Sequence, residues 1–442
     1  MLNNTFAQAD PQVYQIMEQE LERQRSTLML IPSENYASRA VMSAMGSIFT
    51  NKYAEGYPGA RYYNGCENYD QLENLAIERA KELFHCEHVN VQVHTGSQAN
   101  MAAYYAMLKP GDKILAMSVD QGGHLTHGKK QNFSGQFYEA HFYSVDPETH
   151  LIDYDQVLEK AKEVRPQLII AGASAYPRII DFQIFHEIAD EVGAYLMADI
   201  AHIVGLVAAG SHPDPVPCCD LVTSTTHKTL RGPRGAIIMC KQEWAQRVDQ
   251  GVFPGVQAGP LMQIVAAKAV CFKEAQSFGF REYQRQIIRN CQALGQSLIE
   301  EGFEPVTGGT DNHLLLIDLG NKNITGQEAA DLLEAAGMVC NKNLIPYDKR
   351  SPAETSGIRP GTPALTTRGM REEQMHQIGK WIAEVIHQGR EDQATMPFEV
   401  VDRASDDGNS HKGRGEESVV SRIRGEVADL CAQFPIYLDL DD

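Results

Sequence analysis

The sequence lacks the features of membrane-spanning, secreted and nucleic-acid-binding chains. None of its apolar runs approaches the ~18 residues that a membrane-spanning helix needs. Residues 1–10 do not show the basic and then apolar pattern of a signal peptide. Basic side chains are outnumbered, because 39 Lys and Arg stand against 58 Asp and Glu, for a formal charge of -19 at pH 7. Nucleic acids and anionic membranes need a concentrated basic surface, so we expect an acidic cytoplasmic protein with neither partner.

The cysteines and histidines lack the spacings of a metal site. Cysteines number 9 and are scattered without a Cys-X-X-Cys pair, and the adjacent Cys218 and Cys219 are not at ligand spacing. His124 and His127 lie three residues apart, but no Cys, Asp or Glu stands at ligand spacing beside them. We therefore expect reduced thiols and no bound metal.

Two nucleotide-binding motifs are also missing. No Gly-X-Gly-X-X-Gly motif opens the first expected strand–helix unit, which argues against a dinucleotide-binding enzyme. Residues 123–130 approach the phosphate loop of nucleotide hydrolases, but Lys130 stands where a hydroxyl must hold the metal. Neither motif therefore supports nucleotide binding.

The sequence does contain short apolar runs that alternate with amphipathic stretches between about residues 71 and 240. The spacing of Phe182, Phe185 and Ile188 predicts a helix that Asp181 caps. Strands are expected at residues 113–117, 168–172, 195–198, 221–224 and 236–240. Short apolar strands separated by helices predict an α/β fold with a mostly parallel sheet covered by helices on both faces.

A second unit follows a helical stretch that we expect from about residue 262 to 302. Its expected elements are a strand at 313–319 and helices at 326–336 and 372–389. Residues 402–418 are polar, contain glycine and have almost no apolar side chain, so they predict a mobile surface loop.

The N-terminal segment predicts an amphipathic helix. Asp10 can cap free N–H groups, and Pro11 suits the first helical position. Val13, Met17 and Leu21 then recur at helical spacing and give the segment one apolar face.

Lys228 is the first candidate for chemistry. Residues 221–228 form an apolar run that leads into a hydroxyl-rich turn, and Gly232 and Pro233 follow. A surface lysine is normally solvated, but a bare ammonium is costly between a buried strand and such a turn. The position therefore favours an amine that loses its proton and condenses with a carbonyl group.

Two further positions complement the lysine. Asp199 directly follows the expected strand at 195–198. It is either a cap of the following helix or a carboxylate that keeps a pyridinium nitrogen charged. Gly96 and Ser97 form a turn before a helical stretch, where free N–H groups and the helix dipole favour a phosphate. A phosphate turn, an aspartate and a lysine in this order are the minimum equipment of a pyridoxal phosphate enzyme.

Five motifs make the chain closely similar to the serine hydroxymethyltransferase family of fold-type-I pyridoxal phosphate enzymes. The motifs are residues 31–35, 51–59, 122–128, 226–235 and 356–363, and the resemblance runs from residue 30 to about 368. It implies an α/β fold with a large pyridoxal phosphate-binding domain and a smaller C-terminal α/β domain. The implied regions are an N-terminal helix and dimer-interface arm at 1–60, the large domain at 61–285 and the small domain at 286–442.

The resemblance also implies a role for each matching residue. Lys228 would form the Schiff base with the cofactor, Glu55 would handle protons at the transferred one-carbon unit, and His227 would influence substrate choice. The implied cofactor-binding residues are Gly96, Ser97, His124, Ser174, Asp199, His202 and Lys228, with Tyr53 and Gly259 reaching the cofactor from the partner subunit. The implied residues at the substrate are Arg359, which binds the carboxylate, and the nearby Ser33 and Tyr63. The implied folate-binding residues are Tyr62, Val119, Gly123, Leu125 and Asn343.

Several positions differ from the family pattern, among them Val93, Val119, Asp120 and Ala236. Gln121 replaces a histidine, Ala258 replaces one glycine of a Gly-Gly pair, and Ala353 stands where an aromatic is usual near the folate. A Cβ atom at position 258 restricts the approach of the backbone to the phosphate. The changes near the folate predict a somewhat weak folate affinity and leave the amino-acid chemistry intact.

The implied reaction is the reversible transfer of the serine hydroxymethyl group to tetrahydrofolate as co-substrate, giving glycine and 5,10-methylenetetrahydrofolate. The resemblance implies a homodimer with shared active sites. Two alternatives remain open. One is a folate-independent aldolase or transaldolase of β-hydroxy amino acids on the same scaffold, and the other is a cofactor-binding or regulatory protein that has lost catalysis. Glycine formation with and without tetrahydrofolate separates the three.

Overall fold

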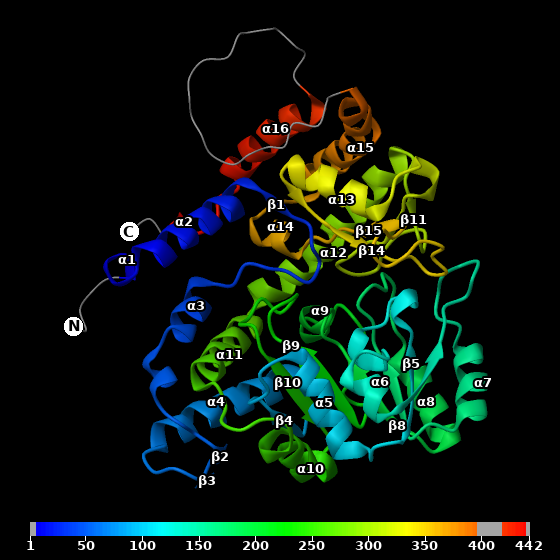
Figure 1. Cartoon of the computed structure of the whole chain (residues 1–442). Helices are drawn as coiled ribbons and strands as arrows, with labels where there is room; N and C mark the ends of the chain where they lie inside the picture. Colours follow the sequence, from blue (N-terminus) through cyan, green and yellow to red (C-terminus); the bar gives the residue numbers. More distant parts are fainter. Residues whose placement is uncertain (1–5, 396–417, 439–442) are drawn as a thin grey trace.

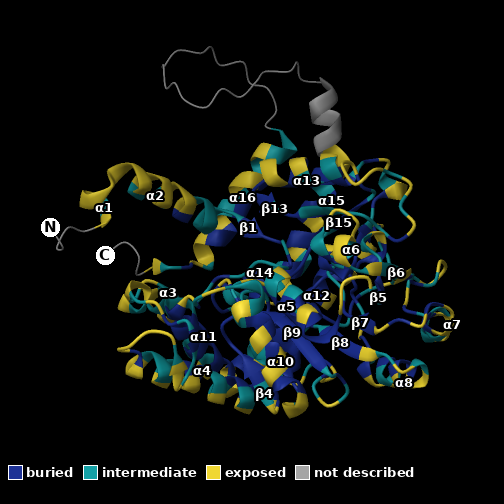
Figure 2. Ribbon diagram, turned by 60° about the horizontal axis from the view of Figure 1, so that its bottom comes forward, coloured by how far each residue is buried: buried dark blue, intermediate teal, exposed yellow. Residues whose placement is uncertain are grey.

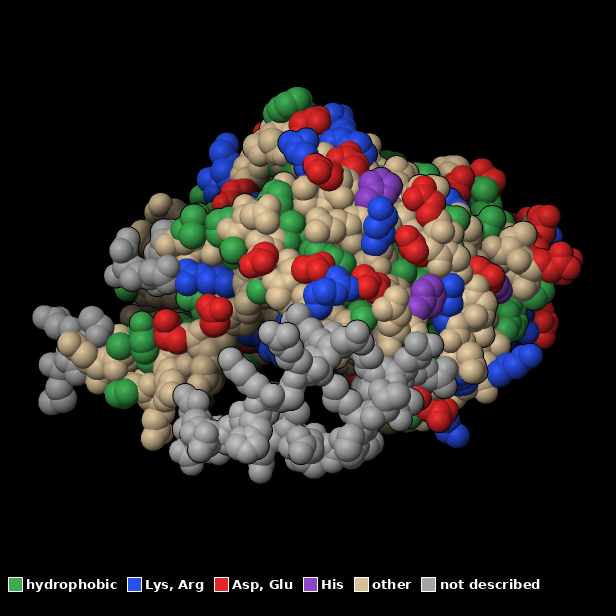
Figure 3. Space-filling view, turned by 90° about the horizontal axis from the view of Figure 1, so that it is seen from above, with side chains coloured by type: hydrophobic (Ala, Val, Ile, Leu, Met, Phe, Trp, Pro, Cys, Tyr) green, Lys and Arg blue, Asp and Glu red, His purple; other side chains and the backbone are tan. Residues whose placement is uncertain are grey.

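The computed structural model describes residues 6–395 and 418–438, and Figure 1 shows their arrangement. The expected mobile loop at 402–418 lies outside the described residues apart from Ser418, whose side chain caps α16 (Val419–Gln433). In the described part of the chain, no helix combines the length and the apolar character that crossing a membrane requires. On the face seen in Figure 3, the described basic side chains are interspersed with acidic ones.

A seven-stranded sheet forms the centre of the fold. From one edge to the other, its strands are β4 (His88–Asn90), β10 (Ala236–Cys240), β9 (Leu221–Thr225), β8 (Tyr195–Asp199), β7 (Leu168–Ala171), β5 (Lys113–Met117) and β6 (Glu139–Tyr143). The neighbours from β9 to β6 pair in parallel, whereas β10 is antiparallel to both β9 and β4. The predicted α/β fold with a mostly parallel sheet is therefore confirmed.

The expected strands are all present, with ends within one residue of the prediction. Strands β4 and β6 have no counterpart among the expected ones. Only Tyr143 of the five residues of β6 is buried, because this strand lies at the sheet edge. An edge strand of this kind contains no continuous apolar run, so its sequence carries no strand signal.

Both faces of the sheet are buried, and neighbouring residues of one strand enter different hydrophobic cores. In β5, Leu115 belongs to one core and Ile114 to the other, because successive side chains of a strand point to opposite faces. The first core is completed by α4 (Glu67–Phe84), α8 (Phe182–Val192) and α11 (Met262–Ala275), and the second by α5 (Gly96–Met107). Burial on both sides explains why these strands are continuously apolar.

Two predicted helix caps are confirmed. The Asp181 carboxylate accepts hydrogen bonds from two N–H groups in the first turn of α8. The Asp10 carboxylate does the same for α2 (Pro11–Ser26), which has Pro11 at its start as expected. In both cases the acid satisfies N–H groups that have no partner within the helix.

The C-terminal part has its own sheet and core. Its four-stranded antiparallel sheet has the order β11 (Glu304–Pro305), β12 (Ile317–Asp318), β15 (Gly357–Arg359) and β14 (Asn341–Asn343). Helices α13 (Gly326–Ala335), α15 (Glu372–Thr395) and α16 pack around the same core. The strand expected at 313–319 is only partly confirmed, because it is reduced to β12 and an isolated antiparallel bridge between Leu314 and Gly361, although the three leucines before β12 are buried.

The helical stretch expected from 262 to 302 is two helices, not one. Helix α11 ends at Ala275, and α12 (Phe278–Glu300) begins after Ser277, whose hydroxyl accepts a hydrogen bond in the first turn. Phe280 packs into the core of the large sheet, whereas Leu294 packs into the C-terminal core. The expected domain boundary after residue 285 falls inside α12, so the division into three regions stays a prediction.

Helix α2 leaves its apolar face uncovered in the single chain. Only Leu21 of this helix is buried, whereas Val13 and Met17 are 46% and 43% exposed. Figure 2 shows α1 (Phe6–Ala9) and α2 mostly in the colour of exposed residues, at one side of the molecule. Strand β1 (Leu28–Met29) then pairs in parallel with β13 (Met338–Val339) and attaches the segment to the C-terminal part.

Candidate functional site

A cavity of about 240 Å³ lies at the carboxyl ends of the parallel strands. Asp199 ends β8, Thr225 ends β9 and Ser174 follows β7, so the cavity occupies the position where α/β sheets bind ligands. Among its lining residues are Lys228, His227 and the expected cofactor-binding residues Gly96, Ser97, His124, Ser174, Asp199 and His202. The structure thus brings together residues that span more than a hundred positions of the chain.

Lys228 lies in a loop that is held together by hydrogen bonds between its own residues. The N–H of Thr226 donates to the carbonyl of Gly235 at 3.0 Å, and the N–H of Gly232 donates to the carbonyl of Thr226 at 2.7 Å. The Thr226 hydroxyl donates to the carbonyl of Pro233 at 2.7 Å. This closed loop holds the side chain of Lys228 at the cavity wall.

The electrostatic surroundings of Lys228 favour a reactive amine. No hydrogen bond joins its Nζ to another residue within 6–395 or 418–438. Burial lowers the pKa of Lys228 to about 8, the Asp199 carboxylate raises it, and the guanidinium groups of Arg359 and Arg234 lower it. A substantial fraction of the amine is therefore neutral near pH 8, and the neutral amine is the form that attacks a carbonyl.

Three donors surround the Asp199 carboxylate. Its Oδ2 accepts a hydrogen bond from Nδ2 of Asn100 at 2.9 Å and lies 3.0 Å from Nε2 of His127, and its Oδ1 accepts from the N–H of Ala201 at 3.1 Å. Burial raises the pKa of Asp199, but the contacts with His127 and Asn100 outweigh burial and hold it well below its usual range. The carboxylate is therefore ionised, as the partner of a charged ring nitrogen must be. Helix α9 (Val204–Ala208) begins without a side-chain cap, so the alternative role of Asp199 as a helix cap is wrong.

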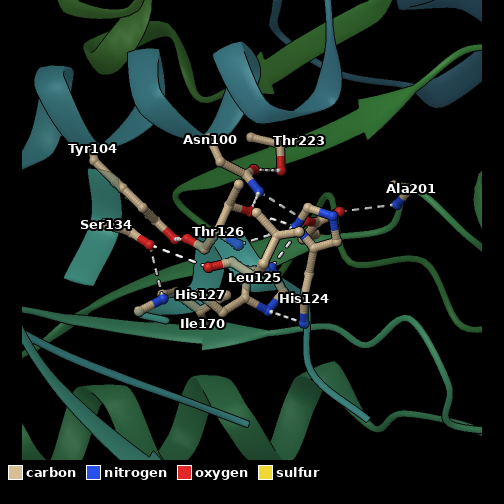
Figure 4. A network of polar contacts seen from close by, with 12 residues as sticks. Asn100, Tyr104, His124, Leu125, Thr126, His127, Ser134, Ile170, Ala201 and Thr223 are labelled. Atoms are coloured by element: carbon tan, nitrogen blue, oxygen red, sulfur yellow. Dashed lines mark hydrogen bonds and ion pairs between the residues drawn. The ribbon is translucent and has the colours of Figure 1, made fainter. Parts of the chain in front are cut away.

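His124 and His127 lie in a short turn beside the cavity (Figure 4). Nδ1 of His124 accepts a hydrogen bond from the N–H of Thr126 at 3.2 Å, and the N–H of His124 donates to Nδ1 of His127 at 3.3 Å. His127 therefore carries its hydrogen on Nε2 and donates it to Asp199. Burial, followed by the neighbouring His127, lowers the pKa of His124 to about 4. A neutral and fixed imidazole at this position suits stacking on a flat cofactor ring.

The tertiary structure also brings a carboxylate to the two histidines. Ligand atoms of His124, His127 and Asp199 lie within 4.8 Å of one another. Sequence spacing does not reveal this carboxylate, because Asp199 reaches the histidine pair from 72 positions along the chain. His127 and Asp199 are already hydrogen-bonded to each other, and the expected absence of a metal stays a prediction.

The start of α5 forms the phosphate turn. Gly96 and Ser97 are the first residues of this helix and line the cavity. N–H groups of the first helical turn have no partner within the helix, and the helix dipole is positive there. A Cβ atom at position 96 would lie 2.7 Å from Cγ2 of Thr225, so glycine allows the turn to pack against the end of β9. The arrangement fits a phosphate bound at a helix N-terminus.

Arg359 contributes a guanidinium without an acidic partner. It ends β15 and donates from Nη1 to the carbonyl of Ser174, which lines the cavity. No Asp or Glu of the described residues forms an ion pair with Arg359, and its Nε is buried without a hydrogen-bond partner. Burial lowers the pKa of Arg359 to about 10, so the group is charged at neutral pH. A substrate carboxylate would supply the missing partner of this buried cation.

Tyr53, Glu55 and Gly259 meet beside the cavity but do not line it in their own chain. A Cβ atom at Gly259 would lie 3.3 Å from Cγ of Glu55 and 3.6 Å from Cδ1 of Tyr53. Tyr53 is 67% exposed and stacks on Tyr63, with the ring centroids 5.5 Å apart. The carbonyl of Gly259 lies 3.2 Å from Nε2 of His94, which does line the cavity. The roles expected for these residues stay predictions.

The remaining expected substrate and folate residues also lie outside the cavity. Ser33 lines a second cavity of about 710 Å³, which shares His227 and Arg234 with the first. Tyr62 is exposed and packs edge-on against Phe253. The other folate candidates are Val119 and Gly123 after β5, the exposed Leu125, and Asn343 on β14.

Asn100 and His127 are site residues that the sequence predictions do not include. Asn100 donates to Thr126 Oγ1 at 2.7 Å as well as to Asp199, and its Oδ1 accepts from Thr223 Oγ1 at 2.7 Å (Figure 4). The sequence feature that could have indicated Asn100 is its place in the first turns of α5, close to the phosphate turn. Its contact with Asp199 joins residues 99 positions apart, which no local pattern reveals.

The residues at the cavity fit pyridoxal phosphate. Lys228 can be neutral at moderate pH, Asp199 is ionised, and a phosphate turn opens onto the same space. The family model of serine hydroxymethyltransferase matches residues 6–382 of the chain. The chain therefore belongs to the serine hydroxymethyltransferase family, whose members are fold-type-I transferases that depend on pyridoxal phosphate.

Proposed function

We propose that the protein reversibly transfers the hydroxymethyl group of serine to tetrahydrofolate, giving glycine and 5,10-methylenetetrahydrofolate. The observation that carries this proposal is the presence of Lys228, Asp199 and the Ser174–Arg359 contact at one cavity. Serine offers an amine that can replace the lysine amine and a carboxylate that can pair with the guanidinium. Membership of the family supports serine and glycine as the amino-acid substrates.

Each side chain at the cavity has a separate task in this reaction. Pyridoxal phosphate, when bound, supplies an electron sink for the bond that breaks at Cα of the amino acid. Asp199 would hold a proton at the ring nitrogen, and the neutral His124 would pack against the ring. Lys228 would hold the cofactor through its amine until the substrate amine takes its place. Arg359 orients the substrate by its carboxylate.

The folate-dependent part of the reaction is assigned to residues outside the cavity. Glu55 would hold or move the proton at the oxygen of the departing hydroxymethyl group. Because Glu55 and Tyr53 lie beside the cavity of their own chain and do not enter it, we propose that they complete the site of a partner subunit. The uncovered apolar face of α2 supports assembly into a homodimer.

The test is the rate of glycine formation from serine with and without added tetrahydrofolate. We expect the rate to depend on folate, and we expect Lys228→Ala to abolish turnover under both conditions. An unchanged rate without folate would reject the transferase and support a folate-independent aldolase. Absence of glycine formation under both conditions would leave only the protein without catalysis.

A further inference from the structure

His202 lines the cavity and is backed by a second histidine. Nδ1 of His202 lies 3.2 Å from Nε2 of His313, with the ring centroids 5.4 Å apart and the planes at 33°. His202 follows β8 of the large sheet, whereas His313 precedes β12 of the C-terminal sheet. The contact therefore joins the cavity wall to the other part of the molecule.

The backbone holds both rings in place. The carbonyl of His202 accepts a hydrogen bond from Oγ1 of Thr229 at 3.0 Å. The carbonyl of His313 accepts one from the N–H of Thr362 at 3.1 Å. The contact between the two imidazoles therefore involves one pair of nitrogens, Nδ1 of His202 and Nε2 of His313.

Both imidazoles are neutral. Burial and then the cations Lys228 and Arg359 hold the pKa of His202 well below its usual range. Burial and then the same two cations lower the pKa of His313 to about 3. The other titratable groups that face the pair are His124 and His212, and neither is acidic. Since a neutral imidazole carries a single N–H, one hydrogen lies between the two facing nitrogens.

The second nitrogen of His313 decides which ring donates. Nδ1 of His313 is buried and has no hydrogen-bond partner among the described residues. If His202 donated through its Nδ1, His313 would carry its own hydrogen on this buried Nδ1, where no acceptor is present. Orphaned buried N–H groups are rare in folded proteins, so this arrangement is disfavoured. We infer that His313 donates from Nε2 to Nδ1 of His202 and is a positioning residue that sets the tautomer of His202.

The consequence is a hydrogen-bond donor at the cavity wall. With Nδ1 as an acceptor, the neutral His202 carries its hydrogen on Nε2. Such a ring donates to an anionic oxygen and does not take up a proton at Nε2 as a general base would. On the proposed function, the acceptor would be an anionic oxygen of pyridoxal phosphate. The ligand thus rests on the proposed function, whereas the tautomer does not.

The direct test is solid-state NMR of the holoenzyme with 15N-labelled histidine rings. His202→Gln and His313→Gln assign the two rings among the 15 histidines of the chain. We expect His202 to be protonated at Nε2 and bare at Nδ1, and His313 to be protonated at Nε2. A His202 ring protonated at Nδ1, or at both nitrogens, overturns the inference. This outcome is independent of whether the enzyme uses folate, so failure of the proposed function is recognised separately in the glycine assay.

Variants of His313 extend the test to cofactor binding. His313→Leu removes the donor, and we expect it to abolish the single tautomer of His202 and to weaken binding of pyridoxal phosphate to the apoenzyme ~10-fold or more. His313→Gln keeps an N–H donor and should restore most of the affinity. His88→Gln is the control, because His88 lies on β4, outside the cavity and away from the histidine pair. If His313→Leu binds pyridoxal phosphate as tightly as the unaltered protein and keeps the same His202 tautomer, the inference is overturned. If this variant does not fold, the NMR spectrum of the unaltered holoenzyme decides alone.

Discussion

Lys228 and Lys268 are both enclosed lysines, and their hydrogen bonds separate their roles. Nζ of Lys268 donates to the carbonyls of Val91, Val93 and Ala236 at 2.7, 2.9 and 2.7 Å. An ammonium has three hydrogens, so this lysine is fully matched in its charged form. Lys228 has no such acceptors among the described residues and opens onto the cavity. Burial alone therefore does not distinguish the two lysines, whereas the difference in acceptors favours Lys228 as the reactive one.

Chemical trapping distinguishes the two lysines. Borohydride reduction of the holoenzyme should attach the cofactor irreversibly to Lys228, and peptide mapping should find Lys268 unmodified. Lys228→Ala should abolish the label and multiple turnover while leaving the fold intact. Modification of any other lysine would contradict the assignment of Lys228.

The pKa of Lys228 predicts the pH dependence of cofactor uptake. Because the neutral amine attacks the carbonyl, the association rate of pyridoxal phosphate with the apoenzyme should rise with pH to a plateau, with a midpoint near the pKa of about 8. The Asp199 carboxylate raises the pKa of Lys228, so Asp199→Asn should move the midpoint to lower pH. Stopped-flow absorbance measures both midpoints. A midpoint that moves upward in Asp199→Asn would contradict the sign of this interaction.

A single substitution at Ala353 tests the expected folate-binding region. Its side chain is exposed, and its carbonyl accepts a hydrogen bond from Nζ of Lys342. An aromatic ring at this position would add stacking of ~0.5–1.5 kcal/mol, which corresponds to a factor of roughly 2–10 in affinity. We expect Ala353→Phe to lower the apparent KM for tetrahydrofolate by that factor and to leave the KM for serine unchanged. Equal changes in both constants would place residue 353 away from the folate.

At the scale of the elements, α11 is the support of the phosphate turn. Lys268 projects from this helix to the carbonyls of Val91 and Val93, which follow β4 and lead into the turn at Gly96. The same side chain reaches the first residue of β10. Helix α11 thereby connects the segment after β4 with the start of β10, and both lie next to the candidate cofactor site.

Removal of this connection should weaken both the fold and the cofactor site. Lys268→Met removes a donor from three buried carbonyls, of which that of Val93 keeps the N–H of Ala236 at 3.2 Å, and we expect it to cost about 2–4 kcal/mol of stability. Thermal unfolding should show a lower midpoint, and amide hydrogen exchange should increase at residues 91–97. Lys273→Met, on an exposed position of the same helix, is the control and should change stability by less than about 0.5 kcal/mol. Equal midpoints for the two variants would contradict the role assigned to Lys268.

At the scale of the whole molecule, two features point to a second subunit. The apolar side chains of α2 are exposed, and the second cavity of about 710 Å³ lies between this helix and the loop that follows Lys228. Tyr53 and Glu55 lie beside the cavity that holds Lys228 and outside its lining. A dimer would cover the apolar surface and allow these residues to reach a neighbouring site.

Mixing two inactive variants tests this arrangement. Lys228→Ala removes the reactive amine, and Glu55→Gln removes the proposed proton-handling carboxylate. If each site takes its lysine from one chain and its glutamate from the other, a mixed dimer contains one intact site. We therefore expect up to about half of the activity per mixed dimer to return after co-refolding. No recovery despite proven subunit exchange, or a fully active monomer in light scattering, would contradict a shared site.

The strands that local sequence predicts are those with both faces buried. Strands β5, β7 and β8 are continuously apolar because helices cover the sheet on both sides. Strand β6 was beyond prediction, since its exposed edge position permits Glu139 and His141. The break between α11 and α12 was missed as well, because apolar residues continue on both sides of the short interruption at Ser277.

By itself, the sequence determined the family and the places of five strands along the chain, and it indicated Lys228 as the candidate reactive lysine. Local patterns suffice for these features, because Asp199 ends a strand, Gly96 begins a helix, and Lys228 lies in the loop that follows β9. Only the tertiary structure decided which side chains hold Asp199 and which ring backs His202. Those contacts join residues 99, 72 and 111 positions apart, and a hydrogen bond depends on distances of about 3 Å that the chain sets only when it folds.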